Sequence, residues 1–360
     1  MPGVFRWLGT AISLCMLLWV FRHSSLPMMA SLLRDLHGSV WLIPLPFAMA
    51  QLTETWAWRS AFKETGCSVA YGPLLRVRLA CEGIAQTIPG GMVIAESIKP
   101  TLLMTQCGLT ASNAVCGAAA RKLLLLVSQC GYFALAVVLG LPALLAATNT
   151  SRLGHWLPTF VILAWLLLVV CAVGLALVMH RGDVCARILS LLKHVPMRAL
   201  RVAADRWHAG FVATDGRFVE FCELGARRLA RPACLYLMTW AWEAVETALL
   251  LTLLGVRFDF GTFCLIEVCA SMIRHVAFVA PAGLGIQDLS YAVLLQVFGV
   301  PDWLGVAATF TLLKRSKELL WSLVGFSLLA SMQRSIRPRR DSSRPRIIDA
   351  GGYASSGAQA

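Results

Sequence analysis

The chain has 360 residues, of which 58% are hydrophobic and only 14% are charged, and its mean hydropathy is +0.70. This composition excludes an ordinary soluble domain and predicts an all-α integral membrane protein. The formal net charge of +13 does not indicate nucleic-acid binding, because Lys and Arg gather in two segments, a distribution typical of positive-inside topology.

Six apolar runs predict six membrane-spanning helices, because most of them approach the roughly 20 residues that a helix needs to cross the hydrocarbon core. In chain order they cover residues 7–21, 40–58, 123–147, 157–179, 234–256 and 304–332. No small-x-small cleavage site follows the first run, which therefore predicts an uncleaved helix and not a signal peptide. The twelve cysteines include no C-x-x-C pair and lie mostly in apolar runs, so we expect no disulfide, metal or cofactor site.

Two basic segments determine the predicted topology. Residues 181–231 contain ten Lys or Arg against five acids, and six arginines follow Met332, so both segments are expected in the cytoplasm. The predicted organisation is a first transmembrane helix with an external loop (1–39), a first membrane repeat (40–150), a linking transmembrane helix (151–180), a basic cytoplasmic loop (181–232), a second membrane repeat (233–332) and a basic disordered cytoplasmic tail (333–360).

The two predicted repeats share short motifs in the same order. Thr-Trp-Ala-Trp at 55–58 recurs at 239–242, and Ile-Pro-Gly-Gly at 88–91 recurs as Ala-Pro-Ala-Gly at 280–283. The charge distribution directs the first Trp motif inward across the membrane and the second outward. We therefore expect an inverted repeat, the arrangement that alternating access requires.

Ionisable residues occupy matching places around the two prolines. Seven residues after each proline stand Glu96 and Asp288, and seven residues before each stand Glu82 and Arg274. Further along, Arg121-Lys122 in the first copy corresponds to Lys314-Arg315 in the second. Several matches in one order favour a true repeat over chance.

The segments on either side of each proline are short. They cover residues 74–88 and 92–107 in the first copy and 262–279 and 284–298 in the second. Helices of roughly 15 residues reach about 23 Å, less than the hydrocarbon thickness of about 30 Å. They therefore predict two re-entrant helical hairpins, although two full crossings per pair would leave the sidedness unchanged.

The hairpin tips combine a turn with free backbone donors. Proline and glycine make the turn, and the N-terminus of the following half-helix attracts an anionic headgroup. Glu96 and Asp288 are either working carboxylates or caps for these helix dipoles. The predicted lipid-binding residues are Glu82, Pro89, Gly90, Gly91, Glu96, Arg121, Arg274, His275, Pro281, Gly283, Gly285, Asp288, Lys314 and Arg315.

Several pairings within this set are expected. Glu82 and Arg274 should pair across the pseudo-axis, and His275 adds a group that titrates near neutrality. The basic residues should hold a lipid phosphate, namely Arg121, Lys122, Lys314, Arg315 and Lys317. Their alternative role is interfacial snorkelling, with Glu318 pairing Lys314 four residues away. Glu54, Glu243 and Glu246, within spanning helices, either line the cavity or lie near an interface.

In this order the motifs resemble the flippase-like domain family, the membrane region of lysylphosphatidylglycerol synthases and of many stand-alone proteins. The resemblance covers about residues 40–332, and Ala57-Trp58-Arg59 with the overall length is similar to its hopanoid-biosynthesis-associated branch. Two departures stand at the second tip, where Ala282-Gly283 replaces the usual Gly-Gly and Asp288 replaces a common Glu. The resemblance implies lipid movement between leaflets, expected in a bacterial inner membrane. It does not extend to lipid synthesis, since no soluble aminoacyl-transferase domain follows.

The sequence thus predicts a lipid flippase or transporter, and not an enzyme, that moves an anionic or lipid-linked headgroup in hopanoid or cell-envelope lipid metabolism. Its expected partners are a membrane lipid and lipid-biosynthetic enzymes. No G-x-x-x-x-G-K-[ST] segment occurs, so ATP hydrolysis by this chain is not expected. Two alternatives stay open: an intramembrane lipid-modifying enzyme that uses the same carboxylates, and a non-catalytic membrane partner of a lipid-biosynthetic complex.

Overall fold

The computed structural model describes residues 15–88, 90–150, 152–187, 190, 198–276 and 284–336, and every regular element in these residues is helical. The elements are α2 (Leu26–Asp35), η1 (His37–Leu42), α3 (Leu45–Glu64), α4 (Tyr71–Thr87), α5 (Gly91–Cys107), α6 (Ala111–Leu139), α7 (Leu141–Thr150), α8 (Arg152–Arg181), α10 (Arg198–Glu223), α11 (Gly225–Leu253), α12 (Phe260–Val276), α13 (Ile286–Val297) and α14 (Trp303–Ile336). The predicted all-α class is confirmed for this part of the chain.

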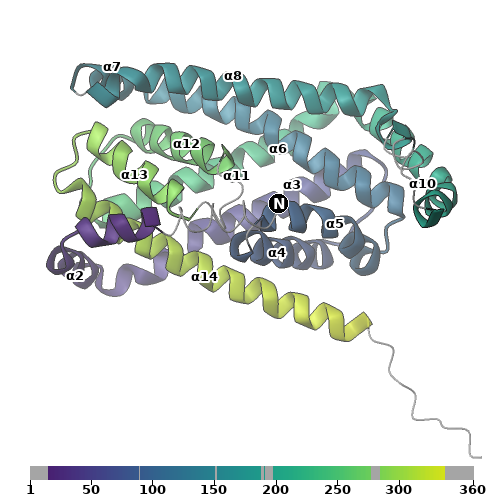
Figure 1. Ribbon diagram of the computed structural model, residues 1–360, viewed down its shortest axis with the longest axis horizontal. Helices are drawn as coiled ribbons and strands as arrows, with labels where there is room; N and C mark the ends of the chain where they lie inside the picture. Colours follow the sequence, from purple (N-terminus) through teal and green to yellow (C-terminus); the bar gives the residue numbers. More distant parts are fainter. Residues whose placement is uncertain are drawn as a thin grey trace, which may run out of the picture.

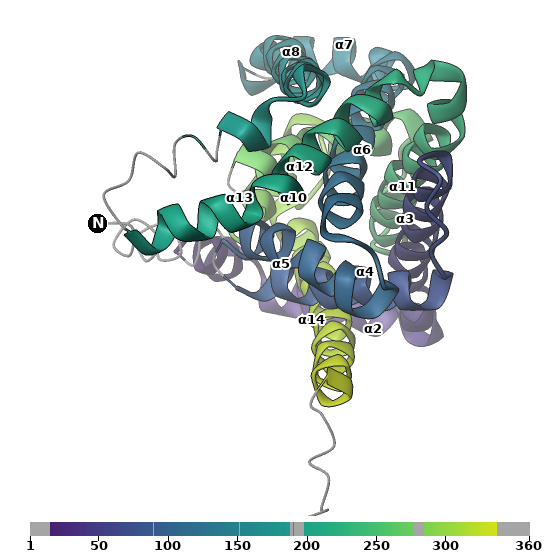
Figure 2. The same ribbon diagram turned by 90° about the vertical axis from the view of Figure 1, so that its right-hand side faces the viewer.

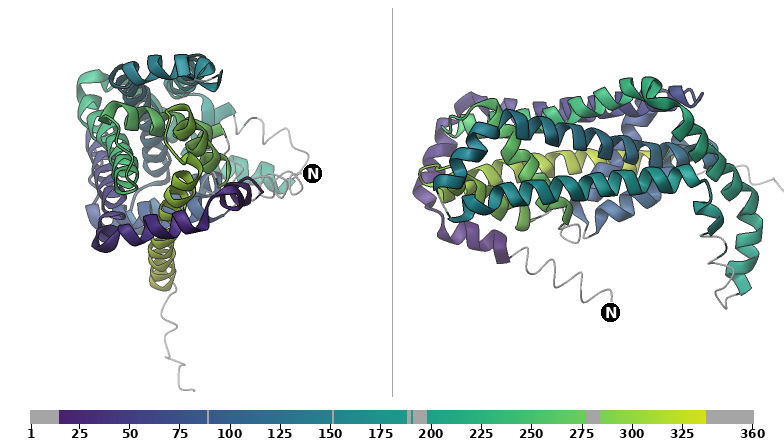
Figure 3. Two further views of the ribbon diagram at one scale, coloured as in Figure 1. Left: turned by 90° about the vertical axis from the view of Figure 1, so that its left-hand side faces the viewer. Right: turned by 90° about the horizontal axis from the view of Figure 1, so that it is seen from above.

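The helices form an elongated bundle. In Figure 1, α8 runs along the upper edge and α14 along the lower edge, with the remaining core helices between them. Seen end-on in Figure 2, α3 and α11 lie side by side, and α10 crosses the end of the bundle. The view from above in Figure 3 places α10 at one end of the long axis and α2 and α7 at the other.

The four short segments around the prolines form separate helices close to their predicted limits. Helices α4, α5 and α12 have 17 residues each and α13 has 12. At 1.5 Å per residue, the longest reach about 26 Å, less than a hydrocarbon thickness of about 30 Å. Their lengths agree with the hairpin interpretation, and re-entrance itself stays a prediction.

Three connecting regions differ from the sequence expectation. The external loop contains α2, which begins after Ser25, whose hydroxyl accepts a hydrogen bond from the Met28 N–H. The basic loop 181–232 holds α10 and the first turns of α11, and the basic tail begins as the last turn of α14. Residues 337–360, and most of the predicted first helix, lie outside the described residues.

The predicted span 123–147 is two helices, because α6 ends and α7 begins at Gly140. A side chain on Gly140 would lie 2.8 Å from the carbonyl oxygen of Gly261, next to the start of α12. The close approach of two backbones therefore marks this break. Helix α6 also begins twelve residues before the apolar run, at Ala111, because its first turns pack against the first copy.

Two apolar cores hold the bundle together. One contains buried side chains of the first copy and of α10, such as Trp58, Leu74 and Phe221. The other lies mainly among α11 to α14 and includes Leu265 and Phe310. Helix α6 contributes to both cores, since its first half packs in one and its second half in the other. Two separate cores leave room for a polar region between them.

Among the described helices, two are long and apolar enough to span a membrane by length and composition alone, α6 and residues Leu153–Arg181 of α8. The outer face of α8 is apolar, with Leu163 61% and Val170 66% exposed. Helices α3, α11 and α14 instead carry buried ionisable residues, which lower their mean hydropathy. The lower hydropathy of these helices therefore comes from residues that face the protein interior.

Two glycines bring α4 and α14 into backbone contact. A Cβ on Gly325 of α14 would lie 2.5 Å from the carbonyl oxygen of Leu79 and 3.0 Å from the Cα of Gly83, both on α4. Neither is the end of a flexible side chain, so the helices themselves would have to separate.

We expect Gly325→Ala to destabilise the protein by about 1–3 kcal/mol and to lower its unfolding temperature in detergent. The matched control is Gly174→Ala on α8, where nothing lies within 4 Å of the added Cβ. The control should be neutral or stabilising by up to about 1 kcal/mol, because alanine is the better helix former. Equal behaviour of the two variants would contradict the close crossing of α4 and α14.

Candidate functional site

A polar cavity of about 180 Å³ lies at the meeting point of helices from both copies. Helices α3, α4, α5 and α6 line it from the first copy, and α11, α12 and α14 from the second. Its charged or titratable lining residues are Glu54, Arg78, Glu82, Glu96, Lys99, Arg121, Lys122, Glu243, Glu246, Arg274, His275, Lys314, Lys317 and Glu318. So many ionisable groups in one cavity of a hydrophobic chain make it the candidate site.

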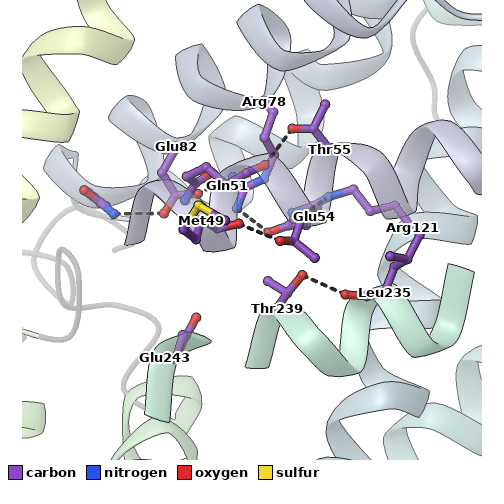
Figure 4. Close-up of polar contacts among 12 residues, drawn as sticks. Met49, Gln51, Glu54, Thr55, Arg78, Glu82, Arg121, Leu235, Thr239 and Glu243 are labelled. Atoms are coloured by element: carbon purple, nitrogen blue, oxygen red, sulfur yellow. Dashed lines mark hydrogen bonds and ion pairs between the residues drawn. The ribbon is translucent and has the colours of Figure 1, made fainter. Parts of the chain in front are cut away.

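Glu54 of α3 is the centre of the first cluster. Its side chain is buried between two guanidinium groups, with Arg78 Nη2 at 2.5 Å from Oε2 and Arg121 Nε at 2.8 Å from Oε1. Arg78 also pairs with Glu82, one turn further along α4. Figure 4 shows Glu54 between the two arginines, with Glu243 of α11 across from them. One carboxylate thus ties α3, α4 and α6 together.

Glu96 of α5 extends this cluster. Its Oε1 accepts from Lys99 Nζ at 2.7 Å and from Arg121 Nη1 at 3.2 Å. The Trp58 ring lies beneath both cations, 5.5 Å from the Arg121 guanidinium carbon and 5.9 Å from Lys99 Nζ. The indole N–H of Trp58 donates to the Gly117 carbonyl at 2.8 Å, which fixes the ring. The cations therefore keep a face of attraction besides their carboxylates.

The second copy has its own cluster around Glu267 of α12. Tyr291 donates its hydroxyl to Glu267 Oε2 at 2.6 Å and accepts from Lys314 Nζ at 2.7 Å. Lys314 also lies 3.4 Å from Glu267 Oε2, and Thr247 of α11 donates to the same carboxylate. These groups join all four helices of the second copy.

Arg315 and Lys317 of α14 turn to different partners. Arg315 lies 2.8 Å from Asp288 and 2.5 Å from Glu318, whereas Lys317 lies 2.5 Å from Glu246 of α11. The second Asp288 oxygen accepts from the Gly285 N–H at 2.8 Å. Asp288 is therefore a helix cap that also holds Arg315.

Equivalent acids meet equivalent bases in the two copies. Glu96 contacts Arg121, and Asp288 contacts Arg315, so in each copy the second hairpin helix pairs with the helix that follows it. Their surroundings differ, however. The Glu96 side chain is 33% exposed and lines the cavity, whereas that of Asp288 is 2% exposed and lies outside the lining.

Two pairings expected from the sequence are wrong. Glu82 does not meet Arg274, because each has a nearer partner in its own copy: Arg78 for Glu82, and Glu243 for Arg274 at 3.4 Å. Lys314 does not pair with Glu318 on the helix surface. It turns inward to Glu267, and the neighbouring Arg315 takes Glu318 at i,i+3 spacing.

The hairpin tips serve as turns. Gly90 has a φ of 69° and Gly285 a φ of 76°, values that favour glycine, and a Cβ on Gly91 would lie 2.2 Å from the Ile84 carbonyl oxygen. None of these three described glycines lines the cavity. The predicted anion site at the second tip is corrected for the Gly285 N–H, which Asp288 occupies. Pro89, Pro281 and Gly283 lie outside the described residues.

Two basic lining groups have uncommitted chemistry. Lys122, next to Arg121 on α6, forms no ion pair and no side-chain hydrogen bond with the described residues. His275 donates through Nδ1 to the Ser271 carbonyl at 2.6 Å, so its Nε2 is the ring atom free to act toward the cavity.

Two buried amides point to the same conclusion. Gln51 and Gln129 line the cavity and are 4% and 2% exposed. The Oε1 atom of Gln51 and the Nε2 atom of Gln129 have no hydrogen-bond partner among the described residues. A buried polar atom without a partner costs about 1–3 kcal/mol, so these amides favour a polar ligand in the cavity.

Sequence reasoning missed several members of the site. Arg78 and Lys99 lie one helical turn from Glu82 and Glu96, a spacing that indicates an ion pair. Glu267 interrupts an apolar run, which is itself a signal of a functional or paired carboxylate. Gln51 and Gln129 carry no comparable signal, because an isolated amide in a helix has no characteristic spacing.

The sequence profile of one protein family, described as the lysylphosphatidylglycerol synthase TM region, matches residues 6–325. The chain belongs to this family. No curated protein and no solved structure matches it. Membership in the lysylphosphatidylglycerol synthase transmembrane-region family confirms the resemblance and makes the chain an integral membrane protein with a lipid-related role. The hopanoid-associated branch stays a prediction.

We expect Glu54→Gln to destabilise this family member by about 3 kcal/mol or more, because it leaves two buried guanidinium groups without their shared counter-charge. The unfolding temperature in detergent is the measurement. The control is Glu220→Gln, whose pair with Arg217 has side chains 63% and 41% exposed, and it should change stability by at most about 1 kcal/mol. Similar losses in both variants would mean that Glu54 does not hold the interior together.

Proposed function

We propose that the protein is a lipid transporter that takes a lipid headgroup into the central cavity while the headgroup moves between leaflets. The observation that supports this function is the cavity itself, a polar, charge-lined space shared by both copies inside an otherwise apolar bundle. A headgroup loses its water when it enters the bilayer, and the cost falls when fixed polar groups replace that water. The acyl chains need no such path, because they are soluble in the surrounding lipid.

Lys122 favours an anionic headgroup. The other cations for which an ion pair is described are held by carboxylates within 3.4 Å, so they are already neutralised. Lys122 has no such partner in the described part of the chain. A phosphodiester carries one negative charge, which Lys122 would neutralise, and the free amide atoms of Gln51 and Gln129 would meet its polar substituents.

The packing supports an inverted repeat, the arrangement on which the proposed transport rests. The equivalent helices α3 and α11 run antiparallel: Lys63 at the end of α3 shares a pocket with Arg231 near the start of α11, and Lys317 lies beside both Phe47 near the start of α3 and Glu246 in the second half of α11. Helices α4 and α14 pack together, and so do their counterparts α12 and α6. In the proposed mechanism, one copy rocks against the other to open the cavity alternately to each leaflet.

The cargo and location follow from the family and the topology rules. We propose a multi-pass protein of a bacterial inner membrane that moves an anionic or lipid-linked headgroup, in hopanoid or cell-envelope lipid metabolism, without catalysing a reaction. Lipid-biosynthetic enzymes are its proposed partners.

The test is leaflet exchange of a labelled anionic phospholipid, such as phosphatidylglycerol, in liposomes that contain the purified protein. We expect wild type to accelerate exchange and Lys122→Gln to slow it about tenfold, the effect of losing one charge-assisted contact. Arg228→Gln, which removes an exposed charge outside the cavity, should exchange lipid at the wild-type rate.

Other results would contradict the proposal in distinct ways. Absence of exchange for anionic and neutral lipids alike, with or without ion gradients, would exclude the transporter. Conversion of the lipid to a new species, seen by mass spectrometry of the extracted liposomes, would support an intramembrane enzyme instead. Equal slowing by Lys122→Gln and Arg228→Gln would remove the specific role of Lys122.

A further inference from the structure

A second polar hollow lies on the outer surface of the bundle, away from the central cavity. It has a volume of about 370 Å³ and lies where the last turns of α3 meet the first turns of α11. We call it the basic pocket, and its polar or aromatic lining residues are Trp56, Arg59, Ser60, Lys63, Ser68 and Arg231. No lining residue is acidic among the residues that the structure describes. The pocket therefore presents three cations without a counter-charge.

The three cations are placed to receive an anion. All three side chains are exposed, and neither Lys63 nor Arg231 forms an ion pair with the described residues. Arg59 donates its Nε–H to the Val69 carbonyl at 3.1 Å. This bond fixes the guanidinium and leaves the two Nη groups for a bidentate contact with a phosphate.

The helix surfaces that lead away from the pocket are apolar. On α3, one outer stripe passes from Leu45, Met49 and Leu52, each 40–52% exposed, to Trp56 at 54%, and then to Arg59 and Lys63. On α11, which runs the opposite way, the exposed stripe changes from Arg231 to Cys234 and Met238. Both helices thus become apolar in the same direction from the pocket.

The dimensions match one leaflet of a bilayer. From Leu45 to Trp56 the stripe rises about 16 Å, and half of the hydrocarbon core measures about 15 Å. Trp56 stands at the boundary between the apolar stripe and the cations, the position that tryptophan favours at a membrane interface. A molecule with a phosphate at one end and a hydrocarbon chain of leaflet length fits this surface.

We propose that the basic pocket binds the phosphate headgroup of an anionic phospholipid whose acyl chains lie along the outer stripes of α3 and α11. This lipid holds the two equivalent helices together at their outer surface and is distinct from the lipid that the central cavity transports. The proposal does not depend on the transport function, because the pocket shares no residue with the cavity lining.

The experiment is native mass spectrometry of the full-length protein in detergent micelles, titrated with phosphatidylglycerol and, separately, with phosphatidylcholine. The test variant is Lys63→Gln with Arg231→Gln, which leaves Arg59 and its bond to Val69 intact. We expect it to weaken phosphatidylglycerol binding about tenfold or more and to leave phosphatidylcholine binding unchanged. The matched control, Arg227→Gln with Arg228→Gln, removes the same charge from the exposed start of α11 and should bind as wild type does.

Three further arms make the interpretation specific. Lys122→Gln should retain the lipid bound at the basic pocket, which separates this site from the cavity. Glycerol phosphate, which has the anion but no acyl chain, should bind at least about tenfold more weakly, since each buried methylene adds about 0.8 kcal/mol. Unfolding temperatures equal to that of the wild type would show that the test variant is folded.

The proposal is overturned by any of three results. The first is equal loss of phosphatidylglycerol in the test and control variants, which would indicate general charge attraction. The second is equal affinity for phosphatidylglycerol and phosphatidylcholine. The third is glycerol phosphate binding as tightly as the lipid, which would assign the pocket to a soluble anion.

Discussion

The contact of Glu54 with Arg78 and Arg121 is the interaction on which the arrangement of the first copy depends. A charge in the interior of a membrane bundle costs several kcal/mol unless it is paired and hydrogen-bonded. The three residues lie on α3, α4 and α6, so these helices must approach to within ion-pair distance. Once they do, Glu82 and Glu96 receive the remaining donors of the same two arginines. The pairing requirement thus creates the wall of the cavity.

The second copy satisfies the same requirement with different chemistry. Its centre is Glu267, which receives Tyr291, Lys314 and Thr247, whereas the first copy has a carboxylate between two guanidinium groups. The two walls of the cavity are therefore related in position but not in charge. An asymmetric cavity of this kind suits one headgroup in a single orientation better than two identical ligands.

The sequence predicted the hairpin helices well because their signals are local. Proline and glycine end one helix and begin the next at a fixed place, and α4, α5, α12 and α13 follow those signals. The break at Gly140 was missed because its cause is a tertiary contact with Gly261. The same reason separates the parts of the site: spacing identified Glu96, Arg121 and Lys122, but Arg121 reaches Glu54 across 67 positions of chain. No local pattern encodes such a crossing.

Glu96 and Asp288 show why equivalent positions need not have equivalent roles. Asp288 is held by the Gly285 N–H and by Arg315, so its turn and its helix are fixed together and it cannot reach the cavity. Glu96 has no capping contact and shares Arg121 and Lys99 within the cavity. In the proposed transporter, a phosphate that arrives at Lys122 would compete with Glu96 for the adjacent Arg121. The first hairpin therefore has an exchangeable counter-ion, whereas the second has a structural one, and the rearrangement that accompanies headgroup binding would begin in the first copy.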